Sequence, residues 1–597
     1  MNTVEADVNR KSTRVDPVTA SIIQGALENI AIEMGYKLMR MAYSSIIRES
    51  EDFGAAICDA TGRQLCECSK STPLQSGPIP GYVRGIIKEF ERRGDVFKPG
   101  DIIVHNDPYN GASHSPDIGF CLPIFHAGQL IGFSVTTAHH LDIGSCQPGS
   151  VGVVVCADAY AEGLVLRALK VFDEGRRNDT VWRLIGDNIR VSELVLGDME
   201  AQMSACHVGA KRFLELVESY SLATLTAAID DLFDFSEGAM RAAIQAIPDG
   251  TYSATGRIDG FLGSDDPTLK NLPICVTVNV RGSDMYIDLA GTADQVPGHA
   301  INMPFVGTVD VALWLTVRSI LLDSDVVGNI PQNDGLFRPI HISAPKGCIA
   351  NPIFPAPTIA RFAPGNIIAD TLMKALAPAV PDKVCAGVAN LKAITFSGFQ
   401  GERQWVHIEI FEGSYGGRFG KDGLDSVDTL YANTRNNPIE DIESHVPLRV
   451  TRYEIREHAC GAGTWRGGWN SVKEVQFLTD GTLSVEGDGH AHAPWGFDGG
   501  AAGHTSSLEL ASGAKDRRAL PSMLPTISVK QGATVRATGG VGGGYGDPFK
   551  RDASLVLTDV ADGYLTRDEA AQQFGVIVAD NGKLDPVATQ KRRQPAR

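Results

Sequence analysis

The stretch between residues 105 and 144 constrains this chain more than any other, because it interleaves histidines with aspartates. Five of the 14 histidines of the 597-residue sequence lie here. The residues concerned are His105, His114, His126, His139 and His140, together with Asp107, Asp117 and Asp142. Imidazole and carboxylate groups are ligands that zinc and manganese select. Strand-like sequence flanks both ends of the cluster, so we expect strand ends to meet around a metal ion.

The sharpest pattern in this stretch is His114-Ser-Pro-Asp117 followed by His139. A proline between two ligands stiffens the turn, so a His and an Asp three residues apart can reach one ion. His139 would arrive from the end of a strand predicted over residues 133–137, and Asp52 could be a fourth ligand. Three protein ligands leave a position open for water, which is typical of a catalytic site. The alternative is a hydrogen-bonded histidine cluster that only ties loops together.

Four neighbouring residues are candidates for supporting roles. His140 could act as a general acid or base, with Asp142 beside it, because an imidazole titrates near neutral pH. A residue packed behind the ligands is an equal alternative for His140. His105 and Asp107 could orient the ligand imidazoles, but the cap of a turn is the favoured interpretation.

Apolar periodicity predicts helices at the start and in the middle of the chain. Asp16 can cap a helix whose first position is Pro17, and helical spacing continues to about residue 45. Long helices are expected between residues 180 and 247, and shorter ones over residues 303–322 and 366–376.

Strand-like sequence occupies much of the remainder, and a helical tail begins near residue 566. The strands are expected over residues 53–58, 102–104, 120–125, 130–137, 250–262 and 274–289. The sequence therefore predicts an α+β (mixed α/β) fold of several lobes with a Gly-rich, β-rich C-terminal half. The expected parts are a disordered tail (1–15), a metal-site lobe with long helices (16–248), a β-rich lobe (249–350) and a Gly-rich mixed α/β lobe (351–597). These lobes could also share one core as a single continuous domain.

Charge and cysteine usage exclude several classes of protein. The balance of 54 basic and 71 acidic residues, a net charge of −17, argues against a nucleic-acid partner. No apolar run approaches the roughly 20 residues of a membrane span, and the N-terminus is too polar for a secretory signal. The 11 cysteines are scattered, as expected for reduced thiols. These features predict a cytoplasmic protein that neither binds nucleic acid nor enters a membrane.

Glycine-rich segments and one His-x-His pair are the remaining motifs. Residues 539–546 are dense enough in glycine to cradle an anion, but they lack the Gly-Lys-Ser/Thr of a P-loop. A tight turn with close backbone packing is therefore favoured there. Arg418 and Arg466 could hold a carboxylate or phosphate, although surface ion pairs are commoner. His490 and His492 are a weak second metal candidate.

A set of motifs occurs in order along the chain. They are Asn106-Asp-Pro-Tyr, Ser113-His-Ser-Pro-Asp117, Ala138-His-His-Leu-Asp-Ile-Gly144, Asn437-Pro-Ile-Glu440 with Glu443-Ser, Gly461-Ala-Gly-Thr-Trp-Arg-Gly-Gly468 and Gly542-Gly-Gly-Tyr-Gly-Asp-Pro548. Together they resemble the hydantoinase B/oxoprolinase family, from about Asp16 to Val578. The resemblance implies metal ligands at His114, Asp117 and His139, with Asp52 as the accompanying carboxylate.

The resemblance also implies a large subunit that works with a hydantoinase A-type partner in a hetero-oligomer such as (AB)2. The partner would bind ATP and Mg²⁺ and phosphorylate the carbonyl oxygen of a small-molecule substrate. The B-type subunit would then carry out the attack on this intermediate at a divalent metal, either zinc or manganese, with iron as a further candidate.

The leading hypothesis is metal-dependent hydrolysis of a cyclic amide, such as a hydantoin or a lactam, driven by ATP. Phosphorylation removes the amide resonance of the ring, so a metal-activated water could attack the ring carbon while His140 or Asp142 accepts a proton. One alternative is an ATP-dependent carboxylase of the acetone or acetophenone type, in which a phosphoenol meets CO2 at the same metal. Another is a non-catalytic scaffold subunit.

Overall fold

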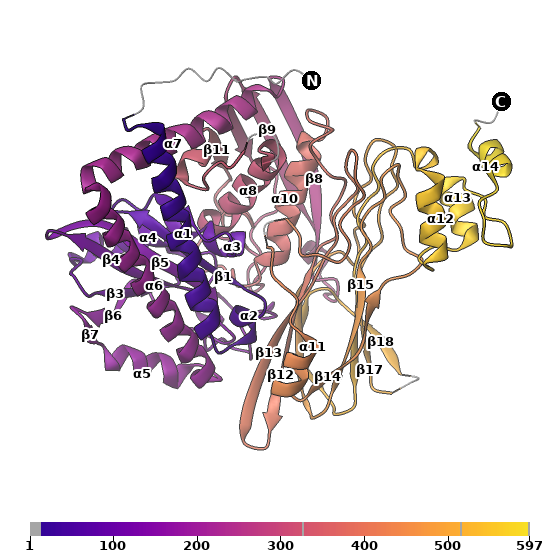
Figure 1. The fold of residues 1–597 in the computed structure, drawn as a ribbon. Helices are drawn as coiled ribbons and strands as arrows, with labels where there is room; N and C mark the ends of the chain where they lie inside the picture. Colours follow the sequence, from indigo (N-terminus) through magenta and orange to yellow (C-terminus); the bar gives the residue numbers. More distant parts are fainter. Residues whose placement is uncertain (1–13, 325–327, 431, 514–515, 595–597) are drawn as a thin grey trace.

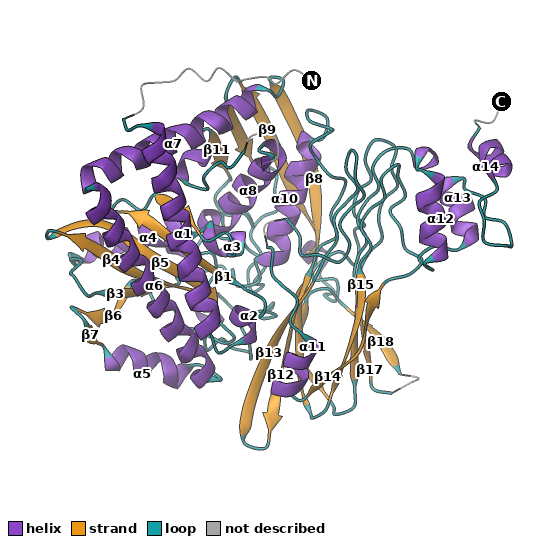
Figure 2. Cartoon of the chain, viewed as in Figure 1, coloured by secondary structure: helices purple, strands orange, loops and turns teal. Residues whose placement is uncertain are grey.

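The computed structural model describes residues 14–324, 328–430, 432–513 and 516–594. It contains four β-sheets together with helices that are most abundant in the N-terminal part, which confirms the predicted α+β class (Figure 2). The tail predicted over residues 1–15 falls mainly on residues 1–13, which lie outside the described residues.

The first sheet has seven antiparallel strands in the order β2-β1-β5-β4-β3-β6-β7. Its strands are β1 (Phe53–Asp59), β2 (Gln64–Glu67), β3 (Ile102–His105), β4 (Asp117–His126), β5 (Gln129–His139), β6 (Leu169–Asp173) and β7 (Arg176–Arg177). The helices of this part are α1 (Pro17–Met41), α2 (Ser45–Arg48), α3 (Pro73–Ser76), α4 (Ile79–Arg93), α5 (Asp179–Asn188), α6 (Ser192–Tyr220) and α7 (Leu222–Gln245). The predicted start of the first helix is confirmed, since Asp16 caps α1 by accepting the N–H of Thr19.

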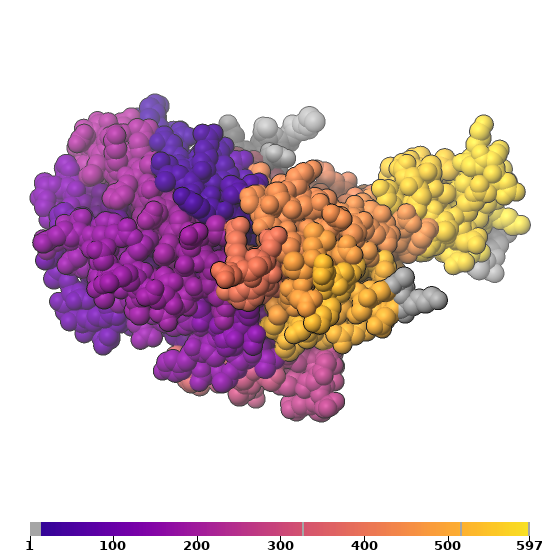
Figure 3. All heavy atoms as spheres, turned by 90° about the horizontal axis from the view of Figure 1, so that it is seen from below, coloured from indigo at the N-terminus to yellow at the C-terminus, as the bar shows by residue number. Residues whose placement is uncertain are grey.

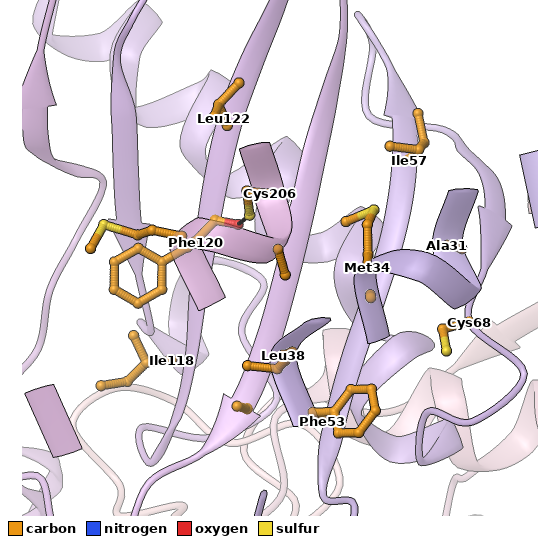
Figure 4. Packing of buried hydrophobic residues seen from close by; sticks show 14 of the residues in the cluster. Ala31, Met34, Leu38, Phe53, Ile57, Cys68, Ile118, Phe120, Leu122 and Cys206 are labelled. Carbon is orange, nitrogen blue, oxygen red and sulfur yellow. Dashed lines mark hydrogen bonds between the residues drawn. The ribbon is translucent and has the colours of Figure 1, made fainter. Parts of the chain in front are cut away.

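Both faces of this sheet are buried. On one face Phe53 and Ile57 of β1 belong to the same apolar core as Met34 of α1, which Figure 4 shows together with part of α6. On the other face Ala56 of β1 packs in a second core with Phe90 of α4. Successive side chains of a strand point to opposite faces, so a sheet covered on both sides needs strands that are apolar throughout. This explains the apolar runs over residues 53–58 of β1 and 118–125 of β4.

The second sheet has the order β11-β10-β9-β8, in which only β10 and β11 are parallel. Its strands are β8 (Gly250–Gly260), β9 (Lys270–Arg281), β10 (Asp284–Asp288) and β11 (Ile340–Ser343). Helices α8 (Asp310–Leu321) and α10 (Phe362–Leu376) share the apolar core of this sheet. The first turn of α10 nevertheless borders the first sheet, because Arg361 directly before it contacts Asp117 of β4.

The C-terminal half contains two antiparallel sheets, β13-β12-β16-β19 and β14-β15-β20-β17-β18, which share one apolar core as a sandwich. The strands are β12 (Lys392–Gln400), β13 (Arg403–Phe411), β14 (Leu448–Ile455), β15 (Ser471–Phe477), β16 (Gly481–Gly487), β17 (Ser507–Ala511), β18 (Arg517–Leu520), β19 (Leu524–Val529) and β20 (Thr534–Thr538). A short helix that the sequence analysis did not predict, α11 (Ile439–His445), precedes β14.

Three helices at the C-terminal end form a knob that extends from the rest of the molecule (Figures 1 and 3). They are α12 (Ala553–Ala561), α13 (Arg567–Phe574) and α14 (Pro586–Arg593). Their apolar core includes Trp469 from the loop before β15. The predicted helical tail is thus confirmed, although it begins earlier than expected. Within the described residues, no helix combines the length and the apolarity needed to cross a membrane.

Candidate metal centre

The three predicted metal ligands lie at one end of the paired strands β4 and β5. Asp117 is the first residue of β4 and His139 the last of β5, and the two face each other directly in the antiparallel register. His114 precedes β4 in a turn in which the N–H of Asp117 donates to the carbonyl of His114, at 3.2 Å. The expectation that the cluster sits at strand ends is therefore confirmed.

Both imidazoles converge on the same carboxylate oxygen. Oδ1 of Asp117 lies 3.0 Å from Nε2 of His114 and 2.9 Å from Nδ1 of His139. The three side chains are buried, and one ligand atom from each lies within 4.8 Å of the others. Among the described residues this is the only group of three or more His, Cys, Asp or Glu with such spacing.

Hydrogen bonds determine which nitrogen of His114 carries its proton. Nδ1 lies 2.8 Å from the carbonyl oxygen of Ile359, which can only accept, so the N–H is on Nδ1. Nε2 then carries an electron pair directed at Asp117 and finds no hydrogen-bonding partner among the described residues. Burial lowers the pKa of His114 to about 4, so the ring is neutral near pH 7.

The same reasoning applies to His139. The hydroxyl of Ser150 donates its single proton to the carbonyl of His140, so Oγ of Ser150 accepts the Nε2–H of His139, at 2.9 Å. In the tautomer that carries this N–H, Nδ1 of His139 directs an electron pair at Asp117. Two imidazole electron pairs and one carboxylate oxygen meeting without a shared proton are the donor set of a divalent cation. The residues present thus fit a metal ion.

Asp117 stays ionised despite its burial. Burial opposes its charge, but the pKa of this carboxyl lies well below its usual range, and the positive charge of Arg361 contributes to this lowering. Its second oxygen, Oδ2, accepts a 2.7 Å bond from Nη2 of Arg361 and a 2.6 Å bond from the hydroxyl of Ser113. An ionised carboxylate is the form that binds a metal.

Asp52 lies beside the group but outside it. The backbone N–H of His139 donates to the carbonyl of Asp52, at 3.2 Å, and the Asp52 side chain accepts the hydroxyl of Thr72, at 3.1 Å. Burial raises the pKa of Asp52 to about 6. A role as fourth ligand stays a prediction.

A cavity of about 20 Å³ adjoins the imidazoles, which is space for about one water molecule. Its lining consists of Ile46, Asp52, Leu74, His114, His139, Val151, Arg361, Phe362, Ile408 and Ile410. Most of these side chains are apolar, so charges inside the cavity interact strongly. The lining comes from three parts of the molecule: the helices and loops around the end of strand β5, the start of α10, and strand β13.

The structure adds three residues that the sequence analysis missed. Arg361 and Ser150 contact Asp117 and His139 as described above, and Gln75 donates its amide N–H to Oδ1 of Asp117, at 2.8 Å. Ser150 lies only 11 residues from His139, in the polar loop 145–150. This closeness in sequence was the one feature from which its contact with His139 could have been predicted. Arg361 follows a proline-rich segment over residues 351–357, which contains no histidine or carboxylate to indicate a metal site.

His140 and Asp142, the predicted proton acceptors, do not line the cavity. Nε2 of His140 lies 2.9 Å from the side-chain oxygen of Gln202 on α6, and its Nδ1 has no partner within the described part of the chain. Asp142 accepts the N–H groups of Gly144 and Gly149 and pairs with Arg190. Asp142 therefore holds the 144–149 loop, and a direct catalytic role for either residue stays a prediction.

His105 and Asp107 have local structural contacts, as the favoured interpretation expected. Asp107 caps the 3-10 helix η1 (Pro108–Asn110) by accepting the N–H of Tyr109, at 3.0 Å. Nε2 of His105 bonds to the carbonyl of Asn110, at 3.0 Å. Both residues thus order the turn before His114.

The other motifs also have structural explanations. The segment 539–546 runs so close to other backbone that a Cβ at Gly542 would collide with the carbonyl of Tyr415, which confirms the close-packing interpretation. Arg466 forms an ion pair with Asp425, at 2.8 Å. His492 bonds to Asn271, and no second metal-type group is found in the described ranges.

Comparison with known proteins shows which family the chain resembles. The family model for hydantoinase B/oxoprolinase matches residues 16–548. A putative B-type subunit of a D-/L-hydantoinase from Pseudomonas sp. (strain NS671) is 57% identical over 582 residues, which is 97% of this chain and 98% of that protein.

Solved structures share the whole fold. The crystal structure of ATP-dependent caprolactamase from Pseudomonas jessenii matches with a TM-score of 0.85 and 26% identity, covering 97% of this chain and all (100%) of that one. A nucleotide-free acetone carboxylase matches with a TM-score of 0.86 over 97% of this chain and 82% of that one, and its 19% identity makes it evidence for the fold alone. The chain belongs to the hydantoinase B/oxoprolinase family.

Proposed function

We propose that this chain is the metal-bearing catalytic subunit of an ATP-dependent enzyme that opens a cyclic amide, such as a hydantoin or a lactam. The observation that carries the proposal is the convergence of two imidazole nitrogens on Oδ1 of a buried, ionised Asp117 beside a cavity. The similarity to a putative D-/L-hydantoinase component and to an ATP-dependent caprolactamase supports this substrate class.

The chemistry requires activation before attack. A cyclic amide is a poor electrophile because its nitrogen donates electron density into the carbonyl. Phosphorylation of the carbonyl oxygen by an ATP-binding A-type partner ends that donation and creates a leaving group. A divalent ion held by His114, Asp117 and His139, zinc or manganese in our proposal, supplies Lewis acidity and lowers the pKa of water.

The residues around the metal group have distinct proposed roles. Arg361 lines the cavity, and its positive charge would stabilise negative charge that develops on the activated substrate during attack. His140 is the better available of the two proposed proton acceptors, because its Nδ1 is unpartnered in the described residues, whereas Asp142 is bonded to Gly144, Gly149 and Arg190. Asp142 orders the loop that carries Ser150.

The partner is the second part of the proposal. The 57%-identical relative is named as one component of a multi-subunit hydantoinase, which supports an A-type partner for this chain as well. ATP and Mg²⁺ belong to that partner, and a hetero-oligomer such as (AB)2 is the expected assembly.

Metal content is the first test. We expect the purified wild-type chain to carry near-stoichiometric zinc, manganese or iron by elemental analysis, and His114→Ala and His139→Ala to lose it. His126→Ala is the matched control, because His126 lies at the opposite end of β4 from Asp117. Full retention of metal in folded His114→Ala and His139→Ala would refute the site.

Turnover with the partner tests the reaction. We expect the reconstituted pair to open a hydantoin or lactam ring with hydrolysis of ATP, and His114→Ala to abolish ring opening. Bicarbonate should have no effect on ATP turnover. A strict requirement for bicarbonate would replace the hydrolase with the carboxylase alternative.

A further inference from the structure

Glu162 is a buried carboxyl group outside the metal group. It ends the 3-10 helix η2 (Ala159–Glu162), and only 1% of its surface is exposed. Its Oε1 accepts the N–H groups of Thr358, at 2.5 Å, and Ile359, at 2.6 Å, and its Oε2 accepts the hydroxyl of Thr358, at 3.4 Å. A buried carboxyl group is costly unless it is hydrogen-bonded. These bonds all go to one short segment before α10.

That segment reaches the metal group at two points. The carbonyl of Ile359 accepts the Nδ1–H of His114, at 2.8 Å, and thereby leaves Nε2 free to face the metal site. Two residues later, the guanidinium of Arg361 pairs with Oδ2 of Asp117, at 2.7 Å. The contact of Ile359 selects the tautomer of His114, and the contact of Arg361 places a positive charge against Asp117.

Other contacts hold the residues on either side of Thr358 and Ile359, but the N–H groups of these two residues bond to Glu162. The amide of Asn302 donates to the carbonyl of Pro357, at 2.8 Å, and the N–H of Ala360 donates to the carbonyl of Ala300, at 2.9 Å. The consecutive N–H groups of Thr358 and Ile359, between these anchors, both point at Glu162. Glu162 therefore fixes the two peptide units between Pro357 and Ile359, directly before the peptide unit that contains the Ile359 carbonyl and the N–H of Ala360.

Glu162 is itself attached to the ligand loops. The N–H of Leu164 donates to the carbonyl of Ile143, at 2.8 Å. The side-chain amide of Asn106 donates to the carbonyls of both Leu164, at 2.9 Å, and Ser115, at 2.7 Å. Ser115 lies in the turn between His114 and Asp117. These hydrogen bonds connect the turn between His114 and Asp117 to the loop that carries Glu162. Glu162 in turn connects this loop to the segment that orients His114.

We propose that Glu162 is a positioning residue for the metal centre: by holding the N–H groups of Thr358 and Ile359, it anchors the segment from which the Ile359 carbonyl orients His114 and Arg361 approaches Asp117. This inference rests on the proposed function, since it concerns the same metal site. Partners that orient metal ligands change metal affinity by about 10–100-fold when they are removed.

The test is the affinity of the full chain for Mn²⁺ and for Zn²⁺, measured by equilibrium dialysis. We expect Glu162→Ala to weaken binding by about 10–100-fold. Glu162→Asp has a shorter side chain, which moves the acceptor oxygen away from the two N–H groups, so it should also weaken metal binding. If Glu162→Ala does not fold, the metal affinity of Glu162→Asp is the test of the positioning role. Glu162→Gln keeps an acceptor oxygen for both N–H groups and should restore affinity to near the wild-type value.

Asp259 provides a matched control. It is also fully buried, and it accepts the N–H groups of His490, at 2.7 Å, and Ala491, at 3.0 Å, and the hydroxyl of Ser522, at 2.9 Å. Asp259→Ala should lower thermal stability and leave metal affinity unchanged.

The possible results separate the two claims. Wild-type affinity in the folded Glu162→Ala or Glu162→Asp chain would overturn the positioning role while leaving the metal site intact. An equal loss of affinity in Asp259→Ala, or no recovery in Glu162→Gln, would also overturn it. A wild-type chain that binds neither ion would instead refute the proposed function on which the inference rests.

Discussion

At the scale of single residues, Asp117 is the centre of the site because five side chains converge on its two oxygens. Gln75 and the two imidazoles lie at Oδ1, and Ser113 and Arg361 at Oδ2. A buried carboxylate with this many partners has a fixed position, which is what a metal ligand needs.

Arg361 and a metal ion would neutralise the same carboxylate, so their effects should be coupled. Removing one partner of a buried ion pair costs about 3–5 kcal/mol, because the other charge is left uncompensated. We expect Arg361→Met to lower the free energy of unfolding by this amount in metal-free protein, and by clearly less after metal is added. Thermal or urea denaturation with and without Mn²⁺ measures the difference.

Arg551→Met is the control for this experiment. Arg551 is also 1% exposed and pairs with Asp422, at 2.6 Å, away from the metal group. Its loss of stability should be the same with and without metal. If Arg361→Met behaves in the same way as Arg551→Met, then Arg361 and the metal do not share Asp117.

At the scale of elements, the sheet holds the site because helices pack closely against it. Helix α6 approaches α1 and β5 at Gly209, where a Cβ would collide with Sδ of Met34 and Oγ of Ser134. In contrast, Gly238 of α7 has open space where its Cβ would be. A side chain is therefore excluded by close packing at Gly209, whereas there is room for one at Gly238.

This contrast predicts opposite effects of the same substitution. Gly238→Ala should stabilise the protein by about 0.5–1 kcal/mol, because alanine favours the helix. Gly209→Ala should destabilise it, since overpacking a core costs about 1–3 kcal/mol and outweighs that gain. Denaturation midpoints of the two variants measure both values, and a stabilised Gly209→Ala would show that α1 and α6 are not in close contact.

At the scale of the whole molecule, the cavity forms where the first sheet meets the C-terminal sandwich. The hydroxyl of Thr395 on β12 donates to the carbonyl of Val151, at 2.7 Å, next to Ser150, the partner of His139. Gly152 follows with a φ of +76° and lies against Ser484 of β16, where a Cβ would collide with its side chain. The contact between the two parts therefore also positions His139, a proposed metal ligand.

Gly152→Ala should disturb this contact and the metal centre together. We expect a loss of stability and a fall in metal affinity of at least about tenfold, because Ser150 moves with the loop. Gly128→Ala is the control: Gly128 has a φ of +80° but open space around it, so only the backbone strain of about 1–2 kcal/mol applies. Equal metal affinity in the two variants would mean that the contact between the parts does not shape the site.

The sequence by itself determined the features that depend on neighbours along the chain. His114 and Asp117 share one turn, and the β4–β5 hairpin around Ala127 and Gly128 brings Asp117 opposite His139. The capped start of α1, the long helices and the apolar strands follow from local periodicity in the same way. The α+β class and the family resemblance could therefore be predicted from the order of the residues alone.

Only the tertiary structure decided which distant groups complete the site. Arg361 lies 244 residues from Asp117, and Glu162 lies 197 residues from Ile359, so no local pattern links them. The tautomer of His114, the burial that sets its pKa and the apolar wall from β13 all arise when segments far apart in the sequence pack together. The periodicity of apolar residues predicts which face of a helix or strand is buried. The contacts of Arg361 and Glu162 depend instead on which distant segment covers that face.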